Sequence, residues 1–174
     1  MDISFAISEW SSWKSQTLSN IAKEKAIGKD PDFSSIPPLL RRRLNLLGRA
    51  CANEILQHIK KDENIPVVYC SQHGDIERTL GILSRAVKGE PASPMNFSLS
   101  VHNAILGVLS IHLGLTSSIS SISSEQHGLV PVMLEAVGML RSGSEKVLCV
   151  LCDVTLPKIY LDDQNLSLIL HQQE

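Results

Sequence analysis

The fold is decided by residues 117–141, which read Ser117-Ser-Ile-Ser-Ser-Ile-Ser-Ser124, Glu125-Gln-His-Gly128 and Leu129-Val-Pro-Val-Met-Leu-Glu-Ala-Val-Gly-Met-Leu-Arg141. Polar and apolar residues nearly alternate over 117–124, which predicts a strand. A sharp turn through 125–128 follows, and then a helix over 129–141 that Gly143 terminates. The unit is therefore a strand, a tight turn and a helix.

The same order of elements recurs on either side of this unit. A buried strand is predicted over Ile65–Cys70, and it leads through Ser71-Gln-His-Gly-Asp75 into a helix that ends near Val87. Two further strands are predicted over Cys149–Val154 and Leu166–Leu170. Strands that alternate with helices favour the α/β class, with a mostly parallel sheet and flanking helices.

The N-terminal third is less regular. Phe5–Trp10 reads as a first strand, and the polar stretch that follows it to Pro37-Pro38 is expected to be largely irregular. One amphipathic helix is predicted from Leu39 to Ile59, with Arg41-Arg42-Arg43 in its first turn. Three cations at a helix start oppose the macrodipole, so either an acidic partner holds them or they form a solvated face.

A length of 174 residues fits one domain spanning 1–174, and the formal net charge of -2 gives no reason to expect nucleic acid as a partner. The start of the chain has an acid, Asp2, where a signal peptide would have a basic region. No apolar run approaches the ~20 residues that span a bilayer, so membrane insertion is not expected. We expect a cytoplasmic protein.

The spacing Cys149-Val-Leu-Cys152 invites a metal or redox interpretation. However, the run Lys146–Asp153 is apolar and strand-like, and residues three apart on a strand point to opposite faces of the sheet. We therefore expect two core cysteines, and no metal or other cofactor.

Another apolar stretch, Leu99–Leu113, is interrupted by His102, Asn103, Gly107 and Ser110. Small residues at Ala104, Gly107 and Ser110 would let another helix approach closely. His102 is open to two interpretations, as a ligand or acid–base group, or as a packed histidine with a satisfied ring nitrogen.

Taken in order, several motifs resemble the N-terminal half of β-ketoacyl synthases. The motifs are Asn103, Gly107, Gly114-Leu115, the strand ending at Ser124, the turn with Gln126 and Gly128, and the stop Leu140-Arg-Ser-Gly143. They follow the family pattern without a gap from Asn103 to Gly143. The string Ser93-Pro-Met-Asn-Phe-Ser-Leu-Ser-Val-His-Asn-Ala104 is similar to short synthase-like proteins of aryl polyene clusters. This resemblance implies half of a thiolase-like (ketosynthase) fold.

By the same resemblance, the position of the family's nucleophilic cysteine falls on Gln126. Glutamine has no ionisable group and cannot attack a thioester as a thiolate does. None of the six histidines matches the family's catalytic histidines, which belong to the second half of the fold. One departure is Ser117-Ser118, where the family usually has Gly-Pro. The resemblance thus implies a protein that is not itself a catalyst.

Chain-length factors are similar in having glutamine at this turn, and each pairs with an active ketosynthase that elongates chains held by an acyl carrier protein. We therefore expect a heterodimer, or a heterotetramer, with a ketosynthase and only indirect contact with the carrier protein. The expected tunnel or interface residues are Asn103, Leu106, Gly107, Leu109, Ser110, Leu113 and Gln126. The alternative for the helical residues is that they are only core.

Three other functions stay open. One is a malonyl-thioester decarboxylase that uses the Gln126 turn, and another is a scaffold that stabilises the synthase without touching the acyl chain. A serine hydrolase built from Ser124, Glu125 and His127 is disfavoured, because adjacent residues at a tight turn point in different directions.

Overall fold

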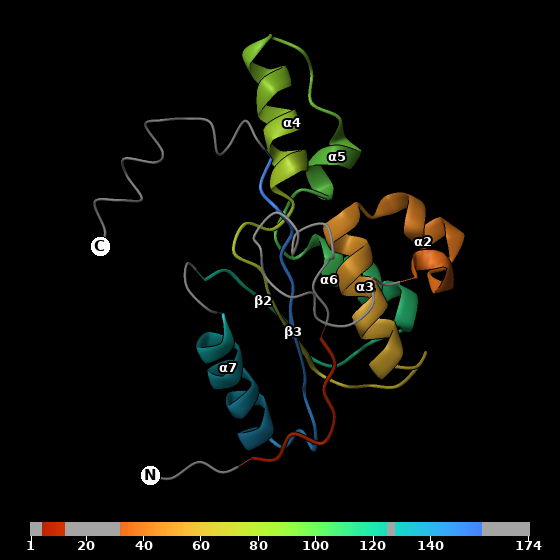
Figure 1. Ribbon diagram of the computed structural model, residues 1–174, viewed down its shortest axis with the longest axis vertical. Helices are drawn as coiled ribbons and strands as arrows, with labels where there is room; N and C mark the ends of the chain where they lie inside the picture. The colour runs from red at the N-terminus through yellow and green to blue at the C-terminus, as the bar shows by residue number, and fades with distance from the viewer. Residues whose placement is uncertain (1–4, 13–31, 125–127, 158–174) are drawn as a thin grey trace, which may run out of the picture.

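The centre of the molecule is a parallel sheet of three strands, as Figure 1 shows for a computed structural model that describes residues 5–12, 32–124 and 128–157. The strands are β1 (Val67–Cys70), β2 (Ile119–Ile122) and β3 (Leu148–Leu151). Their order is β2-β1-β3, and Val67 of β1 is paired with Ile119 of β2 and with Leu148 of β3. The predicted α/β class with a parallel sheet is confirmed, and the predicted strand Leu166–Leu170 lies outside the described residues.

Alternation along β1 divides the core into two layers. Val67 and Tyr69 pack against α3 (Leu46–His58) and α6 (Ala104–Leu113), whereas Val68 and Cys70 pack against α7 (Leu129–Arg141). Figure 1 accordingly shows α3 and α6 on one side of the strands and α7 on the other. All four residues of β1 are buried, and each large apolar side chain so placed contributes about 1.5–3 kcal/mol to folding.

The single helix predicted over Leu39–Ile59 is two helices, α2 (Pro38–Arg43) and α3. The break falls at Leu44 and Asn45, because the side chain of Asn45 accepts a hydrogen bond of 2.9 Å from the amide of Gly48 and so caps α3. The prediction that Arg41–Arg43 lie in a first turn is therefore wrong. They form the last turn of α2, where positive charge is favourable to the helix dipole.

The strand predicted over Phe5–Trp10 is also wrong, since residues 5–12 have no regular secondary structure. The apolar run Phe5-Ala-Ile7 suits a strand, but these residues pair with none of the described strands. Trp10 is 78% exposed and Ile7 66%. Ser11 instead holds this segment on α3 through its side-chain hydrogen bonds to Glu54 and His58.

Two helices project beyond one end of the sheet, α4 (Ile76–Val87) and the short α5 (Pro94–Ser98), as Figure 1 shows. Asp75 caps α4 by accepting from the amide of Arg78 at 3.1 Å. The predicted helix to Val87 is confirmed, whereas α5 was not predicted. A one-turn 3-10 helix, η1 (Phe33–Ser35), precedes α2. No described helix combines the length and the apolar character needed to cross a membrane.

Candidate functional site

The candidate site is the turn between β2 and α7, at the carboxyl ends of the strands. β2 ends at Ile122 and α7 begins at Leu129, so the turn is anchored by the sheet on one side and by a helix start on the other. Gln126, Glu125 and His127 lie outside the described residues, and the structure therefore places none of the three. The chemistry of the turn must be approached from the residues that surround it.

Gly128 brings the start of α7 against the end of β1. A Cβ atom at this position would fall 3.3 Å from the Cβ of Cys70 and closer still to its sulfur. A side chain at 128 would therefore displace the helix or the strand. The glycine that follows Gln126 is required by this close approach, and the sequence indicated it only as a small residue beside the turn.

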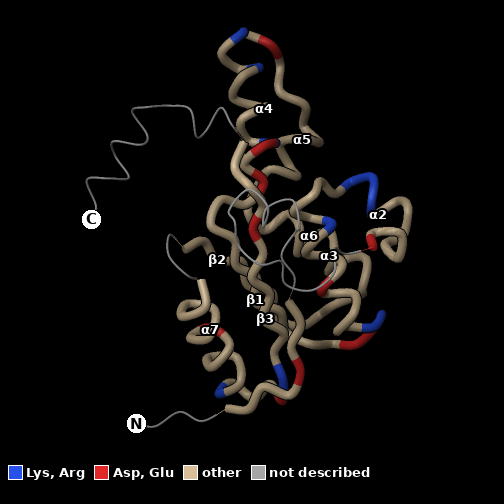
Figure 2. Tube along the Cα trace, viewed as in Figure 1, with Lys and Arg blue, Asp and Glu red and all other residues tan. Residues whose placement is uncertain are grey.

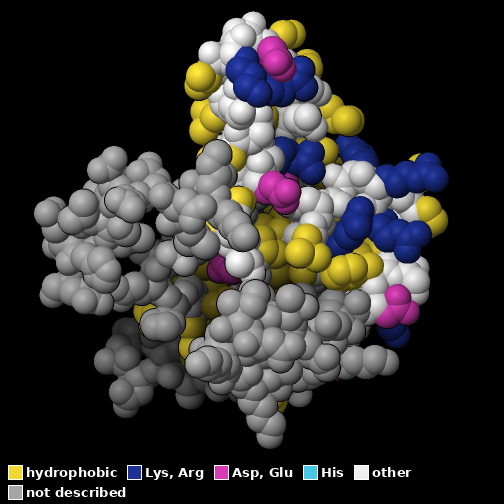
Figure 3. All heavy atoms as spheres, turned by 45° about the horizontal axis from the view of Figure 1, so that its top comes forward, with side chains coloured by type: hydrophobic (Ala, Val, Ile, Leu, Met, Phe, Trp, Pro, Cys, Tyr) yellow, Lys and Arg dark blue, Asp and Glu magenta, His cyan; other side chains and the backbone are white. Residues whose placement is uncertain are grey.

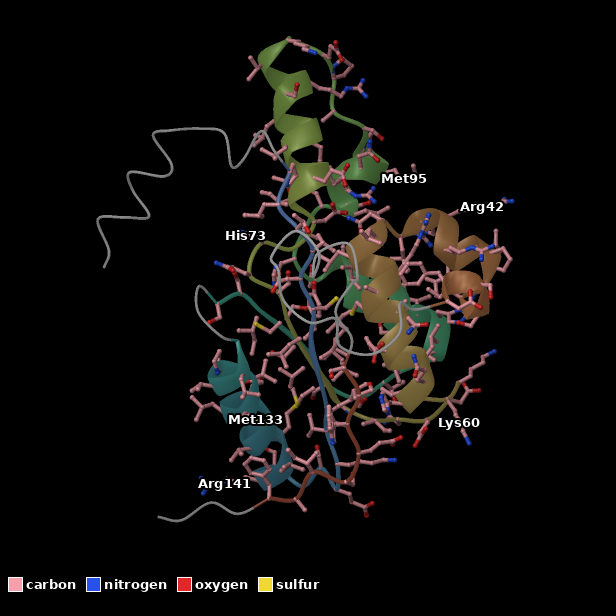
Figure 4. All side chains as sticks on the ribbon, viewed as in Figure 1. Arg42, Lys60, His73, Met95, Met133 and Arg141 are labelled. Atoms are coloured by element: carbon pink, nitrogen blue, oxygen red, sulfur yellow. The ribbon has the colours of Figure 1, made fainter. Side chains whose placement is uncertain are left out.

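Asp153 joins the carboxyl ends of β1 and β3. One of its oxygens, Oδ1, accepts 2.8 Å from the Ser71 hydroxyl and 2.9 Å from the Gln72 amide. The Ser71 oxygen in turn accepts from the amide of Gly74 at 2.9 Å. This network shapes the loop between β1 and α4, on which Figure 4 shows His73. The polar atoms of this network bond to one another, so we interpret the network as structural: it holds the loops beside the candidate site in place.

His102 is a packed histidine rather than an exposed acid–base group. Its Nε2 lies 2.8 Å from the carbonyl oxygen of Ile122, and its ring centroid lies 5.7 Å from that of Tyr69. A Cβ on Gly74, whose φ is +57°, would come within 2.9 Å of the His102 Nδ1. Both ring nitrogens thus face neighbouring groups. This agrees with the interpretation of His102 as a packed histidine with a satisfied ring nitrogen.

The residues expected on α6 divide between its two faces. Leu106, Leu109 and Leu113 are at most 2% exposed and belong to the core shared with α3 and the sheet. Asn103 is exposed, Gly107 and Ser110 are half-buried, and a Cβ on Gly107 would meet nothing within 4 Å. The outer face of α6 is thus formed by Asn103, Gly107 and Ser110, and the leucines form its inner face.

One residue of this outer face was missed by the sequence reasoning. Ile111 follows Ser110 and is 84% exposed, although it is a large aliphatic residue. The helical spacing from Asn103 through Gly107 to Ile111, four residues at each step, could have found it. On the strand that follows, Ile119 of β2 is 39% exposed.

The thiols are poor nucleophiles. Burial raises the pKa of Cys152 to about 12, and it also raises the pKa values of Cys51, Cys70 and Cys149. Cys149 packs on the α7 side of the sheet and Cys152 on the α3 side, which confirms that the two face opposite ways. Within 5–12, 32–124 and 128–157, no group of three or more His, Cys, Asp or Glu residues is arranged to hold a metal ion.

A second cluster combines serine, histidine and carboxylate on the surface of α3. Ser11 Oγ lies 3.1 Å from His58 Nε2, and His58 Nδ1 lies 3.5 Å from a carboxylate oxygen of Glu9. The Ser11 hydroxyl, however, donates to Glu54 at 2.6 Å, and Ser11 and Glu9 are both exposed. We therefore read the cluster as an attachment of the N-terminal segment to α3 and not as a hydrolytic site.

A pocket of about 310 Å³ lies between α4, α5 and the start of α3, away from the turn. Asp75 and Arg78 line it and are joined by an ion pair of 2.8 Å. Arg85 lines it too and is 3.3 Å from Glu90. Because the two arginines are paired with carboxylates, the pocket carries little excess charge.

The comparisons with known proteins agree with the fold. Residues 10–168 match the family model described as "Beta-ketoacyl synthase, N-terminal domain". Among solved structures, the chain is similar to one described as "Ketosynthase (ApeO) in Complex with its Chain Length Factor (ApeC) from Xenorhabdus doucetiae", with 28% identity and a TM-score of 0.67. That match covers 79% of this chain and 56% of the other, so this chain spans little more than half the length of the matched one. No curated protein is similar enough to count as a match.

The predicted resemblance to the N-terminal half of ketosynthases is therefore confirmed, and so is the partial thiolase-like fold that it implied. Because the family match covers far more than half of the sequence, this chain belongs to the family of β-ketoacyl synthase N-terminal domains.

Proposed function

We propose that this protein is a non-catalytic partner of a ketosynthase, of the chain-length-factor type, and that it acts in polyene, fatty acid or polyketide elongation. The observation that carries the proposal is the edge of the described sheet at β2, which lies next in the chain to the uncovered face of α6 with its exposed Ile111. β2 is an edge strand, and no described strand pairs with its outer side. Such an edge offers backbone donors and acceptors to another chain.

The outer face of α6 extends the proposed interface beyond the edge of β2. The chain passes directly from α6 through residues 114–118 into β2, and Ile111 and Ile119 on these two elements are exposed. Gly107 leaves room above the α6 backbone for a close approach by a partner helix. Exposed isoleucines beside a strand edge that no described strand covers favour a contact with another chain at this surface.

The sequence at the turn supports the non-catalytic part of the proposal. Gln126 takes the position of the family's nucleophile, and its amide cannot form a thiolate or an acyl thioester. The cysteines that the structure describes are buried or half-buried, with raised pKa values. Covalent loading of an acyl chain would therefore have to occur on the partner.

For the tunnel-shaping role, the structure favours Ser110 and Gly107 over the buried leucines as the test positions. Enlarging Leu109, which is 1% exposed, would disturb this chain's own core. Ser110 is half-buried on the outer face, where its hydroxyl donates to the Gly107 carbonyl at 3.0 Å. In the complex with a ketosynthase, Ser110→Leu is expected to shorten the products, with Ser84→Leu on the exposed part of α4 as the matched control.

Two alternatives give different results in that experiment. A scaffold that never touches the acyl chain predicts unchanged product length and unchanged yield in Ser110→Leu. A decarboxylase predicts that the purified chain alone releases carbon dioxide from a malonyl thioester and that Gln126→Ala abolishes this release. Shorter products without any carbon dioxide from the chain alone would favour the chain-length-factor role.

A further inference from the structure

Helix α4 carries an apolar stripe that the described part of the chain leaves partly or largely exposed. Its four members recur at steps of four, three and four residues and therefore share one face of the helix: Ile76, Leu80, Leu83 and Val87. Leu83 is 55% exposed and Val87 is 89% exposed. Ile76 and Leu80, nearer the sheet, are half-buried, and no residue of α4 is fully buried. We call these four residues the α4 stripe.

The opposite face of α4 is the one that lies against the protein. The pocket of about 310 Å³ between α4, α5 and the start of α3 is lined by several residues of this face, among them Arg78, Gly81, Ile82 and Arg85. These positions lie about half a turn of the helix away from the stripe. The α4 stripe therefore faces away from the pocket and from the charged pairs beside it.

The central part of the α4 stripe is also free of charge. Every residue between Arg78 and Arg85 is uncharged. Figure 2 accordingly shows charged residues near the tip and near the base of the α4–α5 projection, with an uncharged length of α4 between them. Figure 3 shows hydrophobic side chains on the surface of this projection. Because burying an unpaired charge is costly, a surface that covers the stripe must itself be apolar.

The spacing of the α4 stripe is that of the a and d positions of a heptad, which pack against a stripe of the same kind. A second copy of this chain offers such a stripe. In an antiparallel pair, Leu83 packs against the partner's Leu80, and Val87 packs against the partner's Ile76. An isologous contact of this kind closes on itself as a dimer.

The residues beside the α4 stripe are compatible with the same antiparallel pair. They bring Glu77 opposite the partner's Ser84 and Thr79 opposite the partner's Ala86. The stripe and its flanks thus contain one charged residue in each copy, and the two glutamates lie toward opposite ends of the helix pair. No like charges meet, so a second copy fits the surface in charge as well as in shape.

We propose that two copies of this chain pair through their α4 stripes, antiparallel about a two-fold axis. Because α4 projects beyond one end of the sheet, the two sheets lie at opposite ends of the helix pair (Figure 1). A helix of 12 residues is only about 18 Å long, so we expect a weak, concentration-dependent contact. The contact uses neither β2 nor α6. It therefore does not depend on the proposed function, and it predicts that any complex with a ketosynthase is two-to-two.

Sedimentation equilibrium of this chain alone, over a series of concentrations, tests the pairing. We expect a monomer–dimer equilibrium with a dissociation constant below about 500 μM, and at least roughly tenfold weaker pairing in Leu83→Glu. Val87→Glu changes a residue that is 89% exposed, so it should weaken pairing without a cost to the fold. The matched control is Leu134→Glu, the same substitution on α7 at a leucine that is 66% exposed. It should pair within about twofold of the wild type.

A mixing experiment tests the antiparallel arrangement. Leu80→Lys should prevent self-pairing as Leu83→Glu does, because each places like charges in the apolar contact. Mixed together, the two variants should form a dimer, since the new glutamate of one chain then faces the new lysine of the other. Circular dichroism of each variant establishes that it is folded. Two folded variants that stay monomeric when mixed would contradict the antiparallel pair.

The complex with a ketosynthase separates this proposal from the preceding one. Native mass spectrometry should give a two-to-two complex with the wild type and a one-to-one complex with Leu83→Glu. A chain that dimerises but binds no ketosynthase would contradict the proposed function and support the α4 contact. Three results would overturn the α4 contact: a wild type that is monomeric at every concentration, equal losses in Leu83→Glu and Leu134→Glu, or loss of the ketosynthase itself in Leu83→Glu.

Discussion

Gly128 at the start of α7 lies directly against Cys70 at the end of β1, so closely that no side chain fits between them. The contact joins the helix that follows the turn to the central strand of the sheet, although Gly128 follows the edge strand β2 in the chain. It therefore fixes where α7 begins relative to the end of β1.

Gly128→Ala is expected to lower the free energy of unfolding by about 1–3 kcal/mol, because the new methyl group overlaps Cys70. Urea denaturation measures the loss. Gly138→Ala is the matched control, since a Cβ on this helical glycine meets nothing within 4 Å, and it should be neutral or slightly stabilising. Adding Cys70→Ala removes the sulfur that the new methyl group would overlap. The free energy of unfolding of the double variant should therefore fall by less than the sum of the two single decreases. Strict additivity would contradict the contact.

Asp153→Ala is expected to cost about 1–3 kcal/mol, because it leaves the Ser71 hydroxyl and the Gln72 amide without their acceptor. Asp153→Asn keeps one acceptor oxygen and should cost less. Chemical denaturation gives both values. Equal stability of Asp153→Ala and the wild type would show that the network does not hold the ends of β1 and β3 together.

The strands could be predicted because short apolar runs bounded by turn residues, such as Val67–Cys70, are typical of buried strands. The serine-rich stretch up to Ile122 matched the strand pattern only approximately, because its apolar residues Ile119 and Ile122 are three apart. Phe5–Trp10 also begins with an apolar run, yet a strand needs a neighbour to pair with, and the sequence does not identify one. The break before α3 was missed because apolar spacing continues across Leu44, although Asn45 is a favoured capping residue.

The candidate site could be predicted only in part. The resemblance located the turn, but it could not separate the two faces of α6, since both carry apolar residues. Leu106 and Leu109 were expected at an interface or a tunnel, and they lie in the chain's own core. Ile111 was overlooked and is the most exposed apolar residue of that helix. Periodicity finds the apolar positions of a helix. It does not tell which of them the chain's own core covers, and for α6 this is decided by the packing of α3 against it.

The buried thiols predict a loss of stability in alkali. Because burial raises the pKa of Cys152 to about 12 from its ordinary 9.0, the unfolded chain releases this proton at a lower pH than the folded one. The contribution of Cys152 is therefore fully present below about pH 9 and is lost as the pH rises from there toward 12. The Tm between pH 8 and pH 10.5 should fall less in Cys152→Ala than in the wild type. An identical fall in both would contradict the assignment.

Gly107→Leu is expected to leave the fold of this chain intact and to prevent its association with a ketosynthase. The added side chain meets nothing within 4 Å in the structure, but it would occupy the space proposed for the partner. Gly138→Leu on α7 adds the same side chain where there is also open space, and it should associate normally. Co-purification with the ketosynthase compares the two variants. Normal association of Gly107→Leu would exclude the outer face of α6 from the interface.

The most direct test of the central proposal is native mass spectrometry of this chain after co-expression with a full-length ketosynthase from its own organism. The proposal predicts a one-to-one or two-to-two complex, with an interface in the obligate range of about 2,000 Å² or more. It also predicts acyl chains covalently bound to the ketosynthase and none covalently bound to this chain. A chain that remains a monomer or forms only homo-oligomers while the synthase is present would contradict it.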